Sequence, residues 1–311
     1  MQFSEKTTAF IYPGQASQYV GMGKDLYEEY DSVKELYSKA SDMLGFDLSE
    51  LSFNGPIEKL TQTFVTQPAI FTYSYALTMI LLDNGCKPGF SAGHSLGEYS
   101  AYVAADSMEY IDALRVVKVR ANAMQKACDE NPGTMAAVIG MNFDTLEDLC
   151  NRVTDGGSVR VANLNAPFQL VIAGTRDAVH EVMTSAKEKG AKIVKELNVS
   201  GAFHSSLMES AVEELAESLH STNISAPSFP VYTNFTALPL SDPDEIINSL
   251  SMQITNPVKW YPSILNMATQ GVTNFVEVGP GKVLQGLIKR IDKELIATGV
   301  DSLDDLKKLL N

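Results

Sequence analysis

The chain has 311 residues, of which 45% are hydrophobic, and its mean hydropathy is -0.03. These values are typical of a globular protein with one large domain or two smaller ones. The formal net charge of -14 excludes a uniformly basic surface of the kind that binds nucleic acid, so we expect no nucleic-acid partner.

Strands and helices alternate from the start of the chain. An apolar strand is predicted over 7–12 and a short one over 88–92, with helices around 22–43, 57–63 and 68–84 between them. Further helices are predicted over 98–105 and 108–128. This alternation predicts a mostly parallel sheet covered by helices.

The segment from 134 to 198 has a different pattern. Its predicted order is strand, helix, strand, strand, helix, strand, which is the ferredoxin-like βαββαβ unit. Beyond it the larger α/β pattern resumes, with strands at 230–233 and 273–278 and helices near 207–221, 243–250, 257–268 and 282–291. We therefore predict an α/β-hydrolase-like domain formed by 1–130 and 199–311, with a small subdomain inserted at 131–198. A cleft between the two is a natural ligand site.

The most informative motif is Gly93-His94-Ser95-Leu96-Gly97, which has the G-x-S-x-G pattern of a serine nucleophile on a strand-to-helix turn. The glycines leave room for backbone to approach backbone in such an elbow. The N-terminal N–H groups of the next helix would point at a developing oxyanion.

A serine nucleophile needs a base, and the chain has four histidines. His180 lies off the apolar stripe of its helix, His220 falls in a last helical turn, and His94 adjoins the serine. His204 is predicted on a loop just before a helix that Ser206 and Glu209 would open with a capping box. His204 is therefore the candidate base, with a role in capping that helix as the alternative.

The sequence shows no convincing acid to complete a hydrolase triad. Four aspartates between Ser95 and His204 are candidates, but they fall at helix starts or turns of the inserted unit and none is persuasive: Asp129, Asp144, Asp155 and Asp177. A backbone carbonyl could orient the imidazole instead.

Arg120 lies in the middle of an apolar helical stripe that contains Ala113, Val117 and Met124. Because arginine is rarely buried without a partner, it pairs with an internal carboxylate or faces a cleft that takes an anionic ligand. Facing a cleft, its planar fork would suit a carboxylate.

Several other ligands and locations are not indicated. The first residues lack a basic-then-apolar signal pattern and the longest apolar stretch is too short to span a bilayer, so we expect a cytoplasmic protein without a membrane partner. Cys86, Cys128 and Cys150 have neither disulfide nor metal spacing, and a count of only four histidines argues against a metal site. We expect reduced thiols, no metal and a monomer.

Together these residues resemble the malonyl-CoA:acyl-carrier-protein transacylase family of type II fatty-acid synthesis. The resemblance covers essentially the whole chain. It rests on Pro13-Gly14-Gln15-Ala16-Ser17-Gln18, Thr66-Gln67-Pro68-Ala69, Gly93-His94-Ser95-Leu96-Gly97-Glu98, Arg120 through Met124-Gln125, Asn163-x-Asn165, Gly201-Ala202-Phe203-His204-Ser205, Gln253-x-Thr255-x-Pro257-Val258-x-Trp260 and Glu277-Val278-Gly279-Pro280-Gly281-Lys282.

The resemblance implies a role for each matching residue. Ser95 would be the acylated nucleophile and His204 its base, with ping-pong transfer of malonyl between two thiols. The remaining implied roles are backbone oxyanion donors at Gln15 and Leu96, malonyl-carboxylate binding by Arg120, substrate contacts from Met124, Asn163 and Phe203, and orientation of His204 by the Gln253 carbonyl. The implied substrates are malonyl-CoA and holo-acyl carrier protein, with no separate cofactor.

One residue departs from the family pattern, because Ala16 stands where glycine is usual. If that position needs a positive φ, alanine costs about 1 kcal/mol there. Since carrier protein and CoA are anionic, we also expect a local basic patch, formed by Lys282, Lys289 and Arg290 or by the lysines of the small unit, Lys187, Lys189, Lys192 and Lys195.

Two other functions use the same residues. An esterase or thioesterase would use Ser95 and His204 but has no need of Arg120. A catalytically inactive acyl-group sensor would leave Ser95 unmodified.

Overall fold

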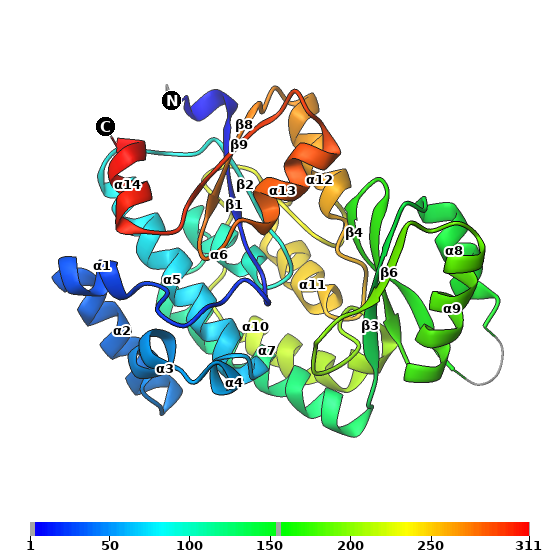
Figure 1. Cartoon of the computed structure of the whole chain (residues 1–311). Helices are drawn as coiled ribbons and strands as arrows, with labels where there is room; N and C mark the ends of the chain where they lie inside the picture. The colour runs from blue at the N-terminus through cyan, green and yellow to red at the C-terminus, as the bar shows by residue number, and fades with distance from the viewer. Residues whose placement is uncertain (1–3, 154–156, 311) are drawn as a thin grey trace.

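The computed structural model describes residues 4–153 and 157–310, and it places two sheets side by side (Figure 1). The larger, sheet A, is parallel throughout and has the order β7-β2-β1-β8-β9; the smaller, sheet B, is antiparallel with the order β4-β5-β3-β6. This confirms the predicted α/β fold. The strands are β1 Thr8–Tyr12, β2 Phe90–Gly93, β3 Thr134–Ile139, β4 Val159–Ala166, β5 Gln169–Gly174, β6 Ile193–Glu196, β7 Val231–Tyr232, β8 Asn274–Val278 and β9 Ile296–Val300.

Helices cover both faces of sheet A and one face of sheet B. The α-helices are α1 Lys24–Glu29, α2 Asp31–Leu44, α3 Leu48–Asn54, α4 Ile57–Leu60, α5 Thr63–Asp83, α6 Gly97–Ala104, α7 Tyr110–Glu130, α8 Phe143–Asn151, α9 Arg176–Glu188, α10 Val212–His220, α11 Pro243–Gln253, α12 Trp260–Thr269, α13 Val283–Ile291 and α14 Leu303–Leu310. Two 3-10 helices, η1 Glu5–Thr7 and η2 Ser206–Ala211, precede β1 and α10.

Strand β1 runs through the centre of sheet A and is buried along its whole length. Its side chains alternate between the two faces, as the pleat requires. Phe10 and Tyr12 join the hydrophobic cluster that contains α5, α6 and α7, whereas Ala9 and Ile11 join the cluster of α12 and α13. Sheet A is therefore the middle layer of three.

The parallel arrangement brings three loops to one edge of sheet A. Tyr12, the last residue of β1, lies beside Gly93, the last residue of β2. The segment after β1 therefore approaches the elbow that follows β2. The loop after β8 (279–282) leaves the same edge, which is where open parallel sheets bind ligands.

Sheet B contains the βαββαβ order that the sequence predicts, with β3 between β5 and β6. Helices α8 and α9 pack on one face through their own hydrophobic cluster. Strand β4 also bonds to the main body, since Leu164 N–H donates to Val258 O and Val258 N–H to Ala162 O, both at 2.8 Å. The division into 1–130 with 199–311 and an inserted 131–198 stays a prediction.

Several boundaries differ from those predicted. The helical stretch over 22–43 is two helices, because Tyr30 is extended between α1 and α2. Helix α5 begins at Thr63 rather than 68, with Pro68 inside it. The sequence patterns missed α3, β9 and α14, which are short elements that pack against larger ones.

Helix α5 corrects one premise drawn from the sequence: because it begins at Thr63, it is long and apolar enough to cross a membrane by length and composition. However, 83% of its most apolar window is buried inside the structure. Core helices of soluble proteins share this length and composition, so the helix carries no membrane prediction.

The close approach of α6 to β1 gives a stability prediction. A Cβ at Gly97 would overlap the backbone oxygen of Tyr12, so Gly97→Ala should destabilise the fold by about 3 kcal/mol. A Cβ at Gly286, inside α13, would point into open space, and Gly286→Ala should stabilise the protein by about 0.5–1 kcal/mol. Thermal unfolding midpoints of the two variants test this, and equal midpoints would contradict it.

Candidate active site

The Ser95 elbow is a strained turn held by one asparagine. Ser95 has a φ of +52°, in the left-handed region that non-glycine residues rarely adopt. Its N–H donates to Asn234 Oδ1 at 2.7 Å, and Asn234 Nδ2 donates back to the Gly93 carbonyl at 2.6 Å. Asn234 follows β7, next to β2 in sheet A, so the neighbouring strand fixes the elbow.

The structure brings Ser95 and His204 together from positions 109 residues apart. Ser95 Oγ lies 2.8 Å from His204 Nε2. His204 Nδ1 lies 2.9 Å from the main-chain oxygen of Gln253, at the end of α11. An N–H on Nδ1 donates to that carbonyl, which leaves Nε2 free to accept the serine proton.

The imidazole bonds to no carboxylate in the part of the chain that the structure describes. Of the four candidate aspartates, Asp155 lies outside the described residues, and Asp129, Asp144 and Asp177 form no hydrogen bond to the imidazole. The carbonyl of Gln253 occupies the position that a triad acid would take. Burial lowers the pKa of His204 to about 3, an effect that nearby Arg120 reinforces and the bond to Gln253 opposes.

His204 lies before η2, as predicted, but the cap differs from the predicted one. Ser205, rather than Ser206, accepts from the N–H of Leu207 at 3.3 Å. Ser206 Oγ instead lies 3.0 Å from Ser158 Oγ. The N-terminal cap is therefore Ser205, one residue earlier than the Ser206–Glu209 spacing predicts. His204, just before this cap, has a φ of +60°.

Arg120 is 1% exposed, and its guanidinium is held by amide oxygens. Nη1 donates to Gln67 Oε1 at 2.6 Å, and Nη2 donates to Gln253 Oε1 at 2.9 Å and to Ser95 Oγ at 3.0 Å. Among the described residues it forms no ion pair with a carboxylate. Of the two environments that the sequence allows, the structure shows a cleft-facing arginine.

A cavity of about 290 Å³ opens over these groups. Its floor carries the polar atoms of Ser95, His204 and Arg120, and its walls are mostly apolar and come from both sheets and from α13. The lining includes Gln15, Leu96, Met124, Asn163, Phe203, Val171, Leu197, Val283 and Leu287. Every predicted site residue except Gln253, which lies behind His204, therefore borders one cavity.

Gln15, in the loop after β1, and Leu96, in the elbow after β2, both border this cavity, and their backbone N–H groups are the expected oxyanion donors. Within the described residues neither has a hydrogen-bond acceptor, whereas the adjacent N–H groups of Ala16 and Ser95 are bonded to Gln18 Oε1 and Asn234 Oδ1. Ala16 has a φ of +79°, so the position does need the conformation that glycine adopts freely. Alanine there costs about 1 kcal/mol.

Three polar residues of the site carry no role in the sequence-based interpretation: Gln67, Glu98 and Asn234. Gln67 and Glu98 fall inside recognised motifs, whereas Asn234 has no motif around it. All three act through hydrogen bonds to residues distant in sequence. No periodicity or spacing signals such contacts.

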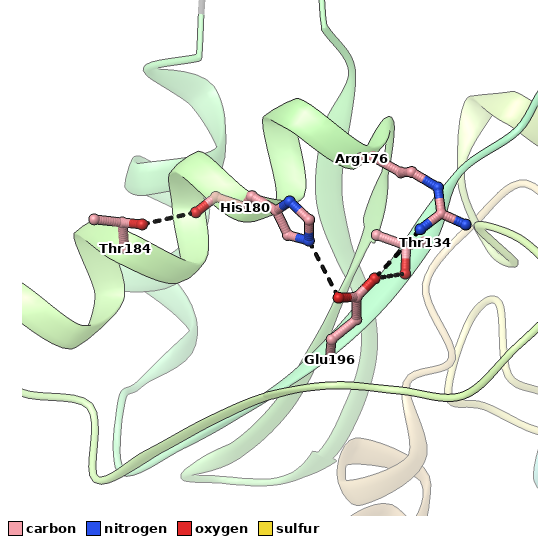
Figure 2. Close-up of polar contacts among 5 residues, drawn as sticks. All are labelled: Thr134, Arg176, His180, Thr184 and Glu196. Carbon is pink, nitrogen blue, oxygen red and sulfur yellow. Dashed lines mark hydrogen bonds and ion pairs between the residues drawn. The ribbon is translucent and has the colours of Figure 1, made fainter.

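The other histidines lie as predicted outside the reacting pair. His94 Nε2 bonds to Asn165 Oδ1 at 2.8 Å and its ring lies against Trp260, so it links the elbow to sheet B. His180 is exposed on α9, and its Nε2 lies 3.2 Å from Glu196 Oε2 on β6. Thr134 and Arg176 contact the other carboxylate oxygen of Glu196 (Figure 2). This surface cluster lies on sheet B.

The structure places a serine, a histidine and a buried arginine around one cavity on a two-sheet α/β fold, and the comparisons identify the family. A family described as acyl transferase domain matches residues 9–303. The chain belongs to this acyl transferase family.

Its similar relatives narrow the class further. The malonyl CoA-acyl carrier protein transacylase of Bacillus subtilis (strain 168) is 42% identical over 96% of this chain and 95% of its own length. That of Escherichia coli (strain K12) is also 42% identical, over 94% of this chain and 95% of its own length.

Solved structures give the same grouping. An acyl carrier protein S-malonyltransferase from Vibrio cholerae has a TM-score of 0.94 and 40% identity, covering 97% of this chain and 99% of that one. A malonyl-transacylase in complex with a type II polyketide synthase acyl carrier protein has a TM-score of 0.94 and 38% identity, covering 98% and 99%. Within the acyl transferases, the chain groups with the malonyl CoA-acyl carrier protein transacylases.

The low pKa of His204 predicts how Ser95 reactivity depends on pH. A base whose pKa is about 3 stays neutral down to strongly acidic pH, so protonation of His204 should not slow the serine between pH 5 and 8. The rate of Ser95 labelling by an uncharged fluorophosphonate, followed by intact mass, measures this. The His204→Ala variant should label at least about 100-fold more slowly throughout. A wild-type rate that falls by half near pH 6.5 would contradict the expectation.

Proposed function

We propose that this chain transfers the malonyl group of malonyl-CoA to the pantetheine thiol of acyl carrier protein and so supplies fatty-acid synthesis. The observation that carries the proposal is the contact between a buried cation and the serine, Arg120 Nη2 to Ser95 Oγ at 3.0 Å. A guanidinium fork at that distance would meet a carboxylate on the acyl group. The names of the relatives support the same substrate pair.

The hydrogen bonds around Ser95 suit nucleophilic catalysis by acyl transfer. Ser95 Oγ attacks the thioester carbonyl while His204 Nε2 takes the serine proton. The N–H groups of Gln15 and Leu96 would stabilise the tetrahedral oxyanion. When it collapses, the CoA thiolate leaves and takes the proton from His204, and the malonyl group remains on Ser95.

The second half of the reaction repeats these steps in reverse. The pantetheine thiol of the carrier protein gives its proton to His204 and attacks the malonyl ester. Ser95 leaves and recovers its proton from the imidazolium. Gln253 holds the imidazole in one tautomer through both halves, and the mostly apolar walls limit the water that competes with the thiol.

Residues around the floor of the cavity would select the acyl group. Arg120 would bind the malonyl carboxylate, exchanging its bond to Ser95 Oγ for bonds to the substrate. Met124, Asn163 and Phe203 border the same space and would limit its size. Phe203 before His204 resembles the pattern of malonyl-selective rather than methylmalonyl-selective relatives.

A serine hydrolase remains the second candidate, because the Ser95–His204 contact alone fits an esterase equally well. Arg120 favours transfer of a carboxylated acyl group over hydrolysis of a neutral one. The proposal also includes a cytoplasmic monomer whose ligands are the two thioesters, without metal, nucleic acid or membrane.

Helix α13 is the best-placed surface for the carrier protein. Val283, Leu284 and Leu287 line the cavity from this helix, while Lys282 and Lys289 at its two ends are exposed. Arg290 is also exposed and donates to Gln169 of sheet B at 2.5 Å. These cations lie on or beside the helix that lines the cavity, on a chain whose net charge is -14, as an acidic partner would require.

Intact-mass measurement after incubation with malonyl-CoA, acetyl-CoA or methylmalonyl-CoA tests the proposed function. We expect a stable malonyl adduct on wild-type Ser95 and none on Ser95→Ala. Arg120→Ala should lower kcat/KM for malonyl-CoA by about 100-fold, equivalent to about 2.7 kcal/mol, and narrow the preference for malonyl over acetyl.

Two results would oppose this function. Rapid release of free malonate without an adduct indicates a hydrolase. Absence of any adduct with an intact fold indicates an inactive acyl sensor.

The predicted docking surface has its own test. The double charge reversal Lys289→Glu and Arg290→Glu should raise the KM for carrier protein by about tenfold at low salt and leave the KM for malonyl-CoA within about threefold. Lys39→Glu, on the distant helix α2, is the matched control and should change neither value (Figure 1). An unchanged KM for carrier protein would remove these two residues from the interface.

A further inference from the structure

Glu98 is a fully buried carboxyl group for which the mechanism above has no use. It lies in the first turn of α6, three residues after Ser95, and its side chain is 0% exposed. Its Oε2 accepts from the Asn234 N–H at 3.0 Å and from Gln253 Nε2 at 2.7 Å. Its Oε1 is buried without a hydrogen-bond partner among the described residues. A buried carboxyl group held this way is costly unless something uses it.

Gln253 connects Glu98 to the reacting groups. The nitrogen end of its amide donates to Glu98 Oε2 and to the Ser95 carbonyl, the latter at 2.9 Å. The oxygen end accepts from Arg120 Nη2 at 2.9 Å. The main-chain oxygen of the same residue bonds to His204 Nδ1. One side chain therefore links the carboxyl group to the cation, with its amide dipole aligned between them.

This arrangement resolves a conflict at Arg120. A buried guanidinium needs a compensating charge. A carboxylate bonded directly to it would occupy the fork that a substrate carboxylate has to reach. A carboxylate placed one amide away attracts the cation and fixes the amide. On the cavity side, the guanidinium then bonds only to the neutral Ser95 hydroxyl, which a substrate carboxylate can displace. The Tyr99 ring, 5.6 Å from the guanidinium carbon, covers another side.

We propose that Glu98 is a positioning residue. Its hydrogen bond orients Gln253, and through Gln253 the Arg120 guanidinium that prefers carboxylated acyl groups, while its negative charge is a remote counter-charge that limits the affinity of Arg120 for a second anion. The inference rests on the proposed function, because it concerns how Arg120 meets a malonyl carboxylate. Glu98 does not contact the reacting atoms, and its effect passes through Gln253.

The charges near Glu98 support the same role. Burial raises the pKa of Glu98 to about 7, against the bonds from Gln253 and Asn234 and the attraction of Arg120. Besides Arg120, the titratable groups that interact with it are Tyr99 and Tyr102 of its own helix, and burial raises the pKa of both above its ordinary value. Both tyrosines therefore stay neutral, so Arg120 is the charged side chain that Glu98 faces when its carboxyl group is ionised.

A bound malonyl carboxylate adds negative charge beside this pair. It should favour the protonated form of Glu98, so malonyl-CoA binds with proton uptake near pH 7. The KM for malonyl-CoA should then rise as pH increases through that range, by about threefold or more between pH 6 and 8. Acetyl-CoA lacks the carboxylate, so its KM should not change with pH over the same range.

Two variants separate the geometric from the electrostatic contribution. Glu98→Gln keeps an acceptor for Gln253 and Asn234 but removes the charge, so kcat should stay within about threefold while the pH dependence of the malonyl-CoA KM disappears. Glu98→Ala removes both, and the ratio of kcat/KM for malonyl-CoA to that for acetyl-CoA should fall by about tenfold or more.

Glu277 provides a matched control elsewhere in the fold. It is also 0% exposed, and burial raises its pKa to about 7, but it bonds to the start of α13 rather than to Gln253. Glu277→Gln should leave both the malonyl-to-acetyl ratio and the pH dependence of KM as in the wild type.

Steady-state kinetics with both thioesters from pH 6 to 8, together with thermal unfolding of each variant, decides the question. The proposal is overturned if Glu98→Ala loses activity equally towards malonyl-CoA and acetyl-CoA, or if Glu98→Gln keeps the wild-type pH dependence. Should Glu98→Ala fail to fold, the Glu98→Gln profile still tests the charge. If Ser95 of the wild-type enzyme does not accept malonyl, the proposed function itself is refuted. The wild-type measurement shows this before any variant is compared.

Discussion

The burial of the Arg120 guanidinium is the constraint on which the rest of the site depends. A cation that is 1% exposed keeps its charge only if polar groups replace the water it has lost. Here the replacements are the amide oxygens of Gln67 and Gln253 and the hydroxyl of Ser95. Because all are neutral, the cation keeps its affinity for a further anion, which a direct ion pair would have removed.

Backbone strain is concentrated at the same place. Non-glycine residues with positive φ include Ala16, Ser95 and His204, which belong to the proposed oxyanion loop and are the proposed nucleophile and base. Each such conformation costs free energy and persists only where surrounding contacts hold it. Asn234 holds the elbow, Gln253 holds the imidazole, and Gln18 bonds to the N–H of Ala16.

The two-sheet architecture gives this polar centre its surroundings. Sheet A brings the loops after β1 and β2 to one edge, and sheet B with α13 covers them with mostly apolar side chains. These apolar side chains exclude water and lower the local dielectric constant, so charge interactions in the site are stronger than in solvent. The same exclusion of water also explains why burial moves the pKa of His204 downwards and that of Glu98 upwards, since in each case the neutral form is favoured.

Elements with a strong local signal could be predicted from the amino-acid sequence. They include the G-x-S-x-G elbow, the βαββαβ order and the position of Arg120 within an apolar helical stripe. Each is a pattern of residues close together in the chain, where turn sterics and side-chain periodicity act directly. The order of strands within each sheet and the short elements α3, β9 and α14 depend on packing between distant segments. So do the contacts of Gln67, Asn234 and Glu98, whose partners lie 53 to 155 residues away. These features become visible in the folded chain alone, because a hydrogen bond between distant segments leaves no periodicity in the sequence that forms it.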